Sequence, residues 1–408
     1  MTVRCCLYIL WGALLPLALQ GQATSSRAAT GLTLDAAVDS ALKHNWDVRT
    51  SIAVGDSARA ETRIARAYPN PTVSAIPNTP FQYAATLPID VGPQRVFRTR
   101  VSDLGARAAR SDIQESARQV VLAVRRAFYD VLLADAKREV VAARRGIMAQ
   151  LVAADSARVR VGELPARALT RSQVELLRTE TDLARAGIDA QSSRLVLQGL
   201  MGVVAADTAL VVNGELRFRD LSFDTGGDVR AALARRPDIE SSRIRDSQSV
   251  AAQKAARSLV LPVPQVTYVR QFNGPFDSGH YYAFGLGFEL PVLNRYGGQK
   301  ARADAAHEAA GVARRRIEAQ ATREIQSTMV EFLAQRALVL RYEAGVITKM
   351  EEGVAAARYA YARGATSLLE VLDALRTQQD ATIEYRTALH DYWVAAYSVE
   401  AANGIPPR

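Results

Sequence analysis

Apolar residues recur at spacings of three and four over most of the chain, which is the pattern of amphipathic helices. The longest such stretch runs from about Phe97 to Val161, and a second runs from about Gln299 to Arg363. At 1.5 Å per residue the first would be a helix of roughly 95 Å. Helices of that length must pack against neighbours along their sides. Shorter helices are predicted over Leu32–Ala67, Ala166–Leu200, Asp228–Leu259 and Ser367–Ala402.

Two short segments, 72–89 and 265–290, have a different period and predict β-hairpins. The second has the clearer alternation, around a turn-forming run at 273–279. One face of its last strand carries Tyr282, Phe284, Leu286, Phe288 and Leu290. The other carries Ala283, Gly285, Gly287 and Glu289.

The apolar face of these strands must be covered either by an ordinary protein core or by lipid. In lipid the strands must close into a barrel, because open sheet edges are not tolerated there. Eight strands make about the smallest barrel, and its interior is filled by side chains. Three chains with four strands each would enclose an open lumen. The long flanking helices, together with the duplication and the N-terminal signal described below, favour lipid as the cover of the apolar strand face.

The second half of the sequence repeats the first. The offset is about 191 residues early in the repeat (Leu42 to Leu233) and about 202 late in it (Gly162 to Gly364). It grows across the hairpin because the second hairpin is the longer. We expect one repeat over 31–202, a linker over 203–227 and a second repeat over 228–404.

The N-terminus has the features of a secretory signal peptide over residues 1–23. Arg4 precedes an apolar run from Leu7 to Leu19, and Gly21-Gln22-Ala23 fits a cleavage site. Both cysteines, Cys5 and Cys6, lie before the apolar run. The mature chain is therefore expected to have no disulfide and no lipid anchor.

Composition and motifs argue against several classes of function. The formal charge of +9 is spread over helical segments without a basic module, so nucleic acid is not an expected partner. His307-Glu308 begins like a zinc-protease motif, but Gly311 occupies the place of the second histidine. The sequence has no P-loop. We expect no cofactor, no structural metal and no enzymatic activity.

Three motifs resemble the TolC family of outer-membrane efflux proteins, in the branch that serves heavy-metal and multidrug pumps. They are Leu32-Thr33-Leu34-Asp35-Ala36-Ala37, Tyr68-Pro69-Asn70-Pro71 and the stretch Tyr361 to Ala374. The resemblance covers about Gly31 to Gly404. It implies a mainly α-helical fold, with an α-barrel in the periplasm and a small β-barrel in the outer membrane. Both barrels would be formed by a homotrimer, with two internal repeats per chain.

The resemblance also implies a passive channel for metal ions or small toxic compounds. A periplasmic adaptor protein would dock on it, and an inner-membrane pump of the resistance–nodulation–division (RND) or ABC type would supply the energy. The adaptor would contact the tips of two helical hairpins: Arg160, Val161, Gly162, Glu163 and Leu164 in the first, and Arg363, Gly364, Ala365, Thr366 and Ser367 in the second.

Glu370 and Asp373 match the acidic positions that line the periplasmic aperture in the family. Their spacing of three puts both carboxylates on one helix face, and threefold symmetry would make two acidic rings. The alternative is a solvated acidic face that the helix dipole favours. The first hairpin departs from the family, since it is short and carries Pro77, Pro80 and Pro88.

A second function remains open at this point. Long helices and tight breaks also suit a soluble periplasmic coiled-coil scaffold or adaptor. The alternation from Tyr282 to Leu290 favours the channel, because a scaffold does not need an aromatic-rich strand face.

Overall fold

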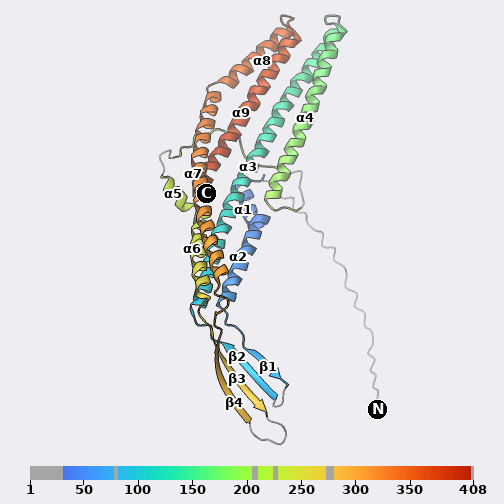
Figure 1. Ribbon diagram of the computed structural model, residues 1–408. Helices are drawn as coiled ribbons and strands as arrows, with labels where there is room; N and C mark the ends of the chain where they lie inside the picture. The colour runs from blue at the N-terminus through green and yellow to red at the C-terminus, as the bar shows by residue number, and fades with distance from the viewer. Residues whose placement is uncertain (1–30, 78–80, 205–209, 224–227, 273–279, 406–408) are drawn as a thin grey trace, which may run out of the picture.

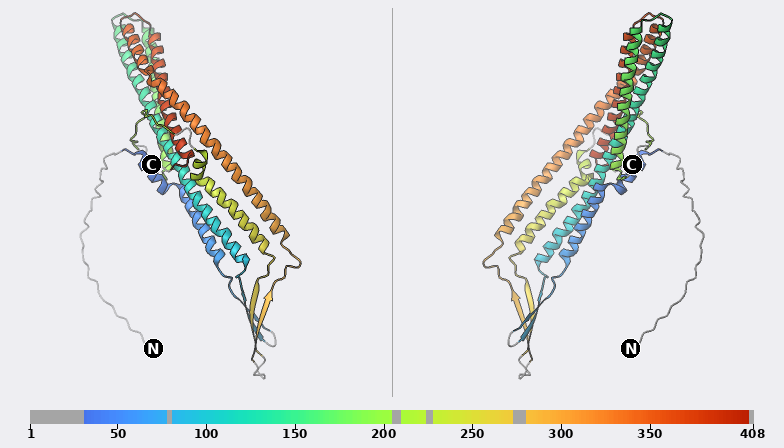
Figure 2. Two further views of the ribbon diagram at one scale, coloured as in Figure 1. Left: turned by 90° about the vertical axis from the view of Figure 1, so that its left-hand side faces the viewer. Right: turned by 90° about the vertical axis from the view of Figure 1, so that its right-hand side faces the viewer.

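The computed structural model describes residues 31–77, 81–204, 210–223, 228–272 and 280–405. The chain forms a long rod with a sheet at one end and two helical hairpins at the other (Figures 1 and 2). The predicted signal peptide, the predicted turn at 273–279 and parts of the linker lie outside the described residues.

Helices make up most of the rod, and α3 spans 68 residues, about 100 Å. The helices of the first half are α1 (Leu34–His44), α2 (Trp46–Arg66), α3 (Pro93–Arg160) and α4 (Ala166–Leu200). Those of the second half are α5 (Val229–Arg235), α6 (Pro237–Ser258), α7 (Gly297–Glu343), α8 (Val346–Ala362) and α9 (Leu368–Ala402). The order of helices in the first half recurs in the second, where α7 and α8 together take the place of α3.

Three helices that the apolar pattern predicted as continuous are broken, which corrects the sequence analysis. Asn45 separates α1 from α2, and its side chain accepts hydrogen bonds from the N–H groups of Asp47 and Val48, at 2.8 and 3.3 Å. Arg236 separates α5 from α6, which starts with Pro237. Gly345, at φ +101°, separates α7 from α8. The apolar period continues across each break, so periodicity alone did not reveal them.

The sheet has four antiparallel strands in the order β1-β2-β3-β4, and the β2–β3 pair joins the two halves of the chain. The strands are β1 (Thr72–Ile76), β2 (Phe81–Pro88), β3 (Pro264–Phe272) and β4 (His280–Phe288). Leu290, which we had placed on the last strand, lies beyond its end. Pro291 follows Leu290 and has no N–H to extend the ladder.

The two faces of the sheet differ in chemistry. Directly paired residues lie on one face, so the register assigns each side chain to a face. One cross-strand row is Val73, Ala85, Tyr268 and Phe284, and the neighbouring row on the opposite face is Thr72, Thr86, Thr267 and Gly285. The hydroxyls of Thr86 and Thr267 lie 3.1 Å apart, within hydrogen-bond distance. Along these rows one face is therefore apolar and aromatic, and the other is small and polar.

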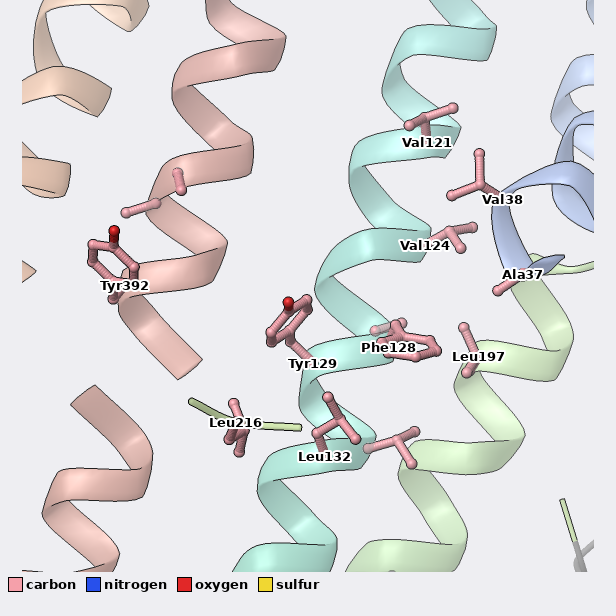
Figure 3. Close-up of a cluster of buried hydrophobic side chains, with 14 of the residues drawn as sticks. Ala37, Val38, Val121, Val124, Phe128, Tyr129, Leu132, Leu197, Leu216 and Tyr392 are labelled. Carbon is pink, nitrogen blue, oxygen red and sulfur yellow. The ribbon is translucent and has the colours of Figure 1, made fainter. Parts of the chain in front are cut away.

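The main core lies at mid-rod, where α1, α3, α4 and α9 meet (Figure 3). Ala37, Val124 and Leu197 are fully buried there. Tyr392 of α9 is also fully buried, and it ties the extended segment 210–223 to the bundle. Its hydroxyl donates to the carbonyl of Arg219 at 2.7 Å and accepts from the N–H of Leu221 at 2.9 Å. The sheet and the helical hairpins thus extend in opposite directions from this packed core.

Candidate functional site

In each half of the chain, the break between the first two helices lies against the end of the last helix of the same half. In the first half, Asn45 at the α1–α2 break donates its Nδ2 hydrogen to the carbonyl of Leu200, at 2.8 Å. In the second, Arg236 at the α5–α6 break donates to the carbonyl of Ala402, at 3.0 Å. Each break therefore binds the end of the last helix of its own half, whose final carbonyls lack partners within the helix.

A glycine completes each of these contacts. Gly202 follows α4 at φ +73°, and a Cβ atom there would lie 2.2 Å from the carbonyl oxygen of His44. Gly404 follows α9 at φ +63°, and a Cβ there would approach the backbone of Arg235 to about 3.0 Å. Only glycine combines the left-handed conformation with so close an approach.

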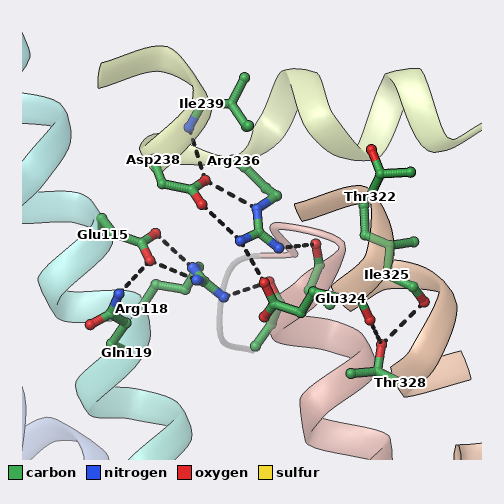
Figure 4. A network of polar contacts seen from close by, with 12 residues as sticks. Glu115, Arg118, Gln119, Arg236, Asp238, Ile239, Thr322, Glu324, Ile325 and Thr328 are labelled. Carbon is green, nitrogen blue, oxygen red and sulfur yellow. Dashed lines mark hydrogen bonds and ion pairs between the residues drawn. The ribbon is translucent and has the colours of Figure 1, made fainter. Parts of the chain in front are cut away.

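Arg236 is the centre of a charged network at the second break (Figure 4). Its guanidinium is 2% exposed and binds the carboxylates of Asp238 and Glu324, both at 2.8 Å. Burial alone would lower the pKa of Arg236, but its hydrogen bonds to these two carboxylates outweigh burial and raise that pKa above its ordinary value. Burial likewise opposes the charge of Asp238, and Arg236 outweighs it and lowers the pKa of that carboxyl. Arg118 of α3 joins the network by donating to the carbonyl of Ala401, at 2.9 Å.

The predicted tip residues lie at the ends of two helical hairpins on the same end of the rod (Figure 1). In both tips a glycine with positive φ ends the incoming helix, at +81° for Gly162 and +72° for Gly364. The N–H of Ala365 closes the second turn on the carbonyl of Ala360, at 2.9 Å, as in a Schellman motif. The tips diverge at the next helix, where Pro165 precedes α4 and Ser367 caps α9.

The two predicted aperture carboxylates lie exposed on the first turns of α9. Glu370 accepts hydrogen bonds from the hydroxyls of Thr366 and Ser367. The Thr366 hydroxyl, followed by that of Ser367, lowers the pKa of the Glu370 carboxyl. Glu370 therefore helps to cap the helix and remains charged, whereas no hydrogen bond or ion pair joins Asp373 to another described residue.

A buried polar contact joins the two hairpins just behind the tips. The Tyr361 hydroxyl of α8 donates to Oδ1 of Asp155 in α3, at 2.8 Å, and Asp155 is 0% exposed. Burial and this hydrogen bond raise the pKa of Tyr361 to about 12. Oδ2 of Asp155 has no hydrogen-bond partner in the described part of the chain. Because the contact is buried and only half satisfied, it depends on the spacing of the hairpins.

His390 of α9 lies between two carboxylates. Its Nε2 lies 2.8 Å from Asp130 of α3, and its Nδ1 lies 2.8 Å from Asp391. Burial alone would lower its pKa, but the hydrogen bonds to Asp130 and then Asp391 raise it to about 9. His390 is thus a positively charged link between α3 and α9 at neutral pH.

This link should make the protein less stable in alkaline solution. A raised pKa in the folded state adds stability that is complete below the unfolded value near 6.5 and is lost as pH rises through about 9. We expect a loss of about 2 kcal/mol between pH 6 and 9.5, allowing for the half-exposed carboxylates. His390→Gln should abolish it, and His44→Gln, at an exposed site, should keep it. Thermal unfolding at both pH values measures the difference; equal losses in wild type and His390→Gln would contradict the assignment.

The contacts of His307 do not form a catalytic relay. Ser249 and Asp246 both approach His307, but both face the same ring nitrogen, Nδ1, at 2.8 and 3.7 Å. A relay needs one partner on each nitrogen. Among the described residues no group of three or more His, Cys, Asp or Glu side chains could hold a metal ion.

The helices of the described residues contain no stretch both long and apolar enough to cross a membrane.

Sequence reasoning missed the polar contacts of Arg236, Asp155 and His390. For Arg236 a signal existed, because Pro237 follows it and proline favours the first position of a helix. For Asp155 and His390 no signal existed, since their partners lie 206 and 260 residues away in sequence.

The chain is similar in sequence to a metal-resistance protein and in fold to outer-membrane channels. No protein-family model matches the sequence. The chain is 24% identical over 394 residues to the cobalt-zinc-cadmium resistance protein CzcC of Cupriavidus metallidurans, a match that covers 92% of this chain and 91% of that one.

Solved structures share the fold over nearly the whole chain. The Campylobacter jejuni outer-membrane channel CmeC superposes with a TM-score of 0.81 at 17% identity, covering 92% of this chain and 87% of that one. CusC, described as forming a transmembrane channel, superposes with a TM-score of 0.78 at 18% identity, covering 91% of each chain. The chain therefore has the fold of these outer-membrane channels over nearly its whole length, in agreement with the resemblance to the TolC family that the motifs around Tyr68 and Tyr361 carry.

Proposed function

We propose that this chain forms the outer-membrane channel of a tripartite efflux system. Three copies enclose one continuous tube, with the sheet in the outer membrane and the helices in the periplasm. Cargo moves through it passively, and we assign the chain no enzymatic activity.

The sheet is the observation that carries this proposal. It presents an apolar face, on which Phe284 is 80% exposed and Leu286 is 79% exposed, at the end of a rod that offers it no cover. In the strand order β1-β2-β3-β4, the outer edges of β1 and β4 pair with no other described strand. Lipid would cover the apolar face, and neighbouring chains would supply hydrogen-bond partners for both open edges.

The helical part of the rod has exposed apolar side chains on two sides, where neighbouring copies of the chain would pack. α4 and α7 lie on opposite sides of the rod (Figures 1 and 2). Leu177 and Ile188 of α4 are 64% and 65% exposed, and Val330 of α7 is 69% exposed. In a closed ring of copies, the apolar side chains of these two outer helices would be buried against the adjacent chains. A soluble single-chain scaffold gives no reason for these faces.

The cargo we propose is heavy-metal cations. The observation in favour is the match to CzcC, whose name refers to resistance to cobalt, zinc and cadmium. We further propose that an adaptor protein docks on the tips around Gly162 and Gly364 and links them to an inner-membrane pump. The resistance–nodulation–division type is the pump class that the sequence motifs favour.

Membrane fractionation and electrical recording test the function together. We expect heat-resistant trimers in the outer-membrane fraction, and discrete conductance steps when the purified trimer is added to a planar bilayer. A periplasmic chain that stays monomeric and adds no conductance would support the scaffold instead.

The acidic pair on α9 should control cation passage at the aperture. Glu370→Gln with Asp373→Asn removes both charges and keeps a side chain that can accept the capping hydrogen bonds of Glu370. We expect block by divalent cations to weaken about tenfold, because a ring of like charge concentrates cations at the pore. Conductance traces with and without zinc measure the block.

Glu163→Gln is the matched control, since Glu163 is an exposed carboxylate on the other tip. It should leave the block unchanged. Unchanged block in the double variant would refute the aperture role of the pair.

A further inference from the structure

Arg270 is the one Arg, Lys, Asp or Glu residue in the four described strands. It lies two residues before the end of β3, at the end of the sheet far from the helices. Its register partners are Tyr83 and Tyr282, so it lies on the apolar face. A positive charge on that face needs a physical explanation, since charge facing lipid is unfavourable away from the membrane interface.

Aromatic rings hold the guanidinium of Arg270. Its central carbon lies 4.5 Å from the ring centre of Phe272 and 5.6 Å from that of Tyr282, within the range of cation–π contacts. Its Nε is buried, and among the described residues nothing accepts a hydrogen bond from it and no ion pair includes Arg270. The cation is thus positioned by rings, and no carboxylate of the described residues neutralises it.

The surrounding residues form an aromatic belt. The rings of Tyr83 and Phe272 lie 5.7 Å apart, and those of Tyr268 and Tyr282 lie 6.2 Å apart. Such belts mark the level of lipid headgroups. Arg270 is about 7 Å from the strand end at 3.3 Å per residue, which puts its charge near that level.

A phosphate group matches this environment best. Guanidinium binds phosphate through two parallel hydrogen bonds, and the planar cation can stack on rings at the same time. Arg270 is on the face opposite the polar row of Thr86 and Thr267, so anions in the lumen do not reach it. The phosphate must come from the lipid side.

We propose that Arg270, held by Phe272 and Tyr282, binds the phosphate of an anionic lipid in the outer leaflet of the outer membrane. This inference rests on the proposed function, because the sheet must lie in that membrane. The bound lipid would fix the depth of the sheet and supply a counter-charge that none of the described residues provides at this position.

Lipid binding can be measured on trimers in a nonionic sugar detergent, which contains no phosphate. Diphosphorylated lipid A is added, and native mass spectrometry and thermal dissociation of the trimer are recorded. We expect bound lipid A and a rise in dissociation temperature for the wild type. Arg270→Gln should lose most of both, Arg270→Lys should keep part, and Arg295→Gln, beyond the opposite end of β4, should behave as wild type.

Two further additions identify the source of the phosphate. Inorganic phosphate alone, and lipid A stripped of its phosphates, should produce neither effect. The inference is overturned if Arg270→Gln binds lipid A as the wild type does, or if either addition reproduces the rise in temperature.

Conductance recording separates this inference from the proposed function. Wild-type trimers that conduct in a bilayer and do not bind lipid A would overturn the lipid site and leave the channel standing. Wild-type protein that neither inserts nor conducts would overturn both.

Discussion

Replacing Gly202 by alanine is expected to destabilise the folded chain by about 3 kcal/mol. About 1 to 2 kcal/mol comes from forcing a residue with a Cβ into the left-handed conformation, and the rest from overpacking. The added Cβ would lie 2.2 Å from the carbonyl oxygen of His44, which is backbone and cannot move aside. The end of α4 would have to separate from the α1–α2 break. Thermal unfolding of the purified protein measures the loss.

Gly199→Ala is the matched control, three residues earlier in the same helix. A Cβ there meets no atom within 4 Å, and alanine favours the helix, so stability should stay equal or rise. Gly404→Ala should fall between the two, since its Cβ would lie about 3.0 Å from Arg235. A Gly202→Ala protein as stable as the wild type would refute the role given to this contact.

Replacing Arg236 by methionine should have an effect of similar size. The carboxylates of Asp238 and Glu324 would lose their partner, and the carbonyl of Ala402 would lose a donor. Breaking a buried ion pair from one side costs about 3 to 5 kcal/mol. Because the carboxylate side chains are 22% and 36% exposed, we expect about 3 kcal/mol.

Two variants test whether the orphaned charges cause this loss. Adding Asp238→Asn and Glu324→Gln to Arg236→Met should restore part of the stability, because no buried charge is then left unpaired. Arg257→Met, in the helix α6 that begins directly after Arg236, removes an exposed ion pair with Asp304 and should cost less than about 1 kcal/mol. Urea unfolding compares all of them; a triple variant no more stable than Arg236→Met would contradict this explanation.

The fold class was predictable because its signals are local and repeated. The three- and four-residue spacing marked the long helices, and the alternation from Tyr282 to Phe288 marked the strand. The prediction of a mainly helical chain with a small sheet and internal repeats was confirmed. The breaks at Asn45, Arg236 and Gly345 were not predicted, because each is set by one cap or one dihedral angle and leaves the apolar period intact.

The candidate site was less accessible from sequence. The glycines at positions 162 and 364 marked the tips, since a helix commonly ends at such a residue. The aperture role of Glu370 and Asp373 stays a prediction, and the capping contacts of Glu370 give it a second, structural role. The contacts of Asp155 with Tyr361 and of His390 with Asp130 join distant segments, and each needs the packed helices before it can form.

The unpaired edges of β1 and β4 have a consequence for biogenesis. In the proposed trimer, a newly exported chain exposes a row of backbone donors and acceptors along the outer edge of the nine-residue β4, next to Phe284 and Leu286, until neighbouring chains pair with it. Such an edge recruits any other strand that it meets. Closure of the proposed ring then competes with aggregation of the unpaired chains. β1, with five residues, offers wrong partners a much shorter template than β4 does.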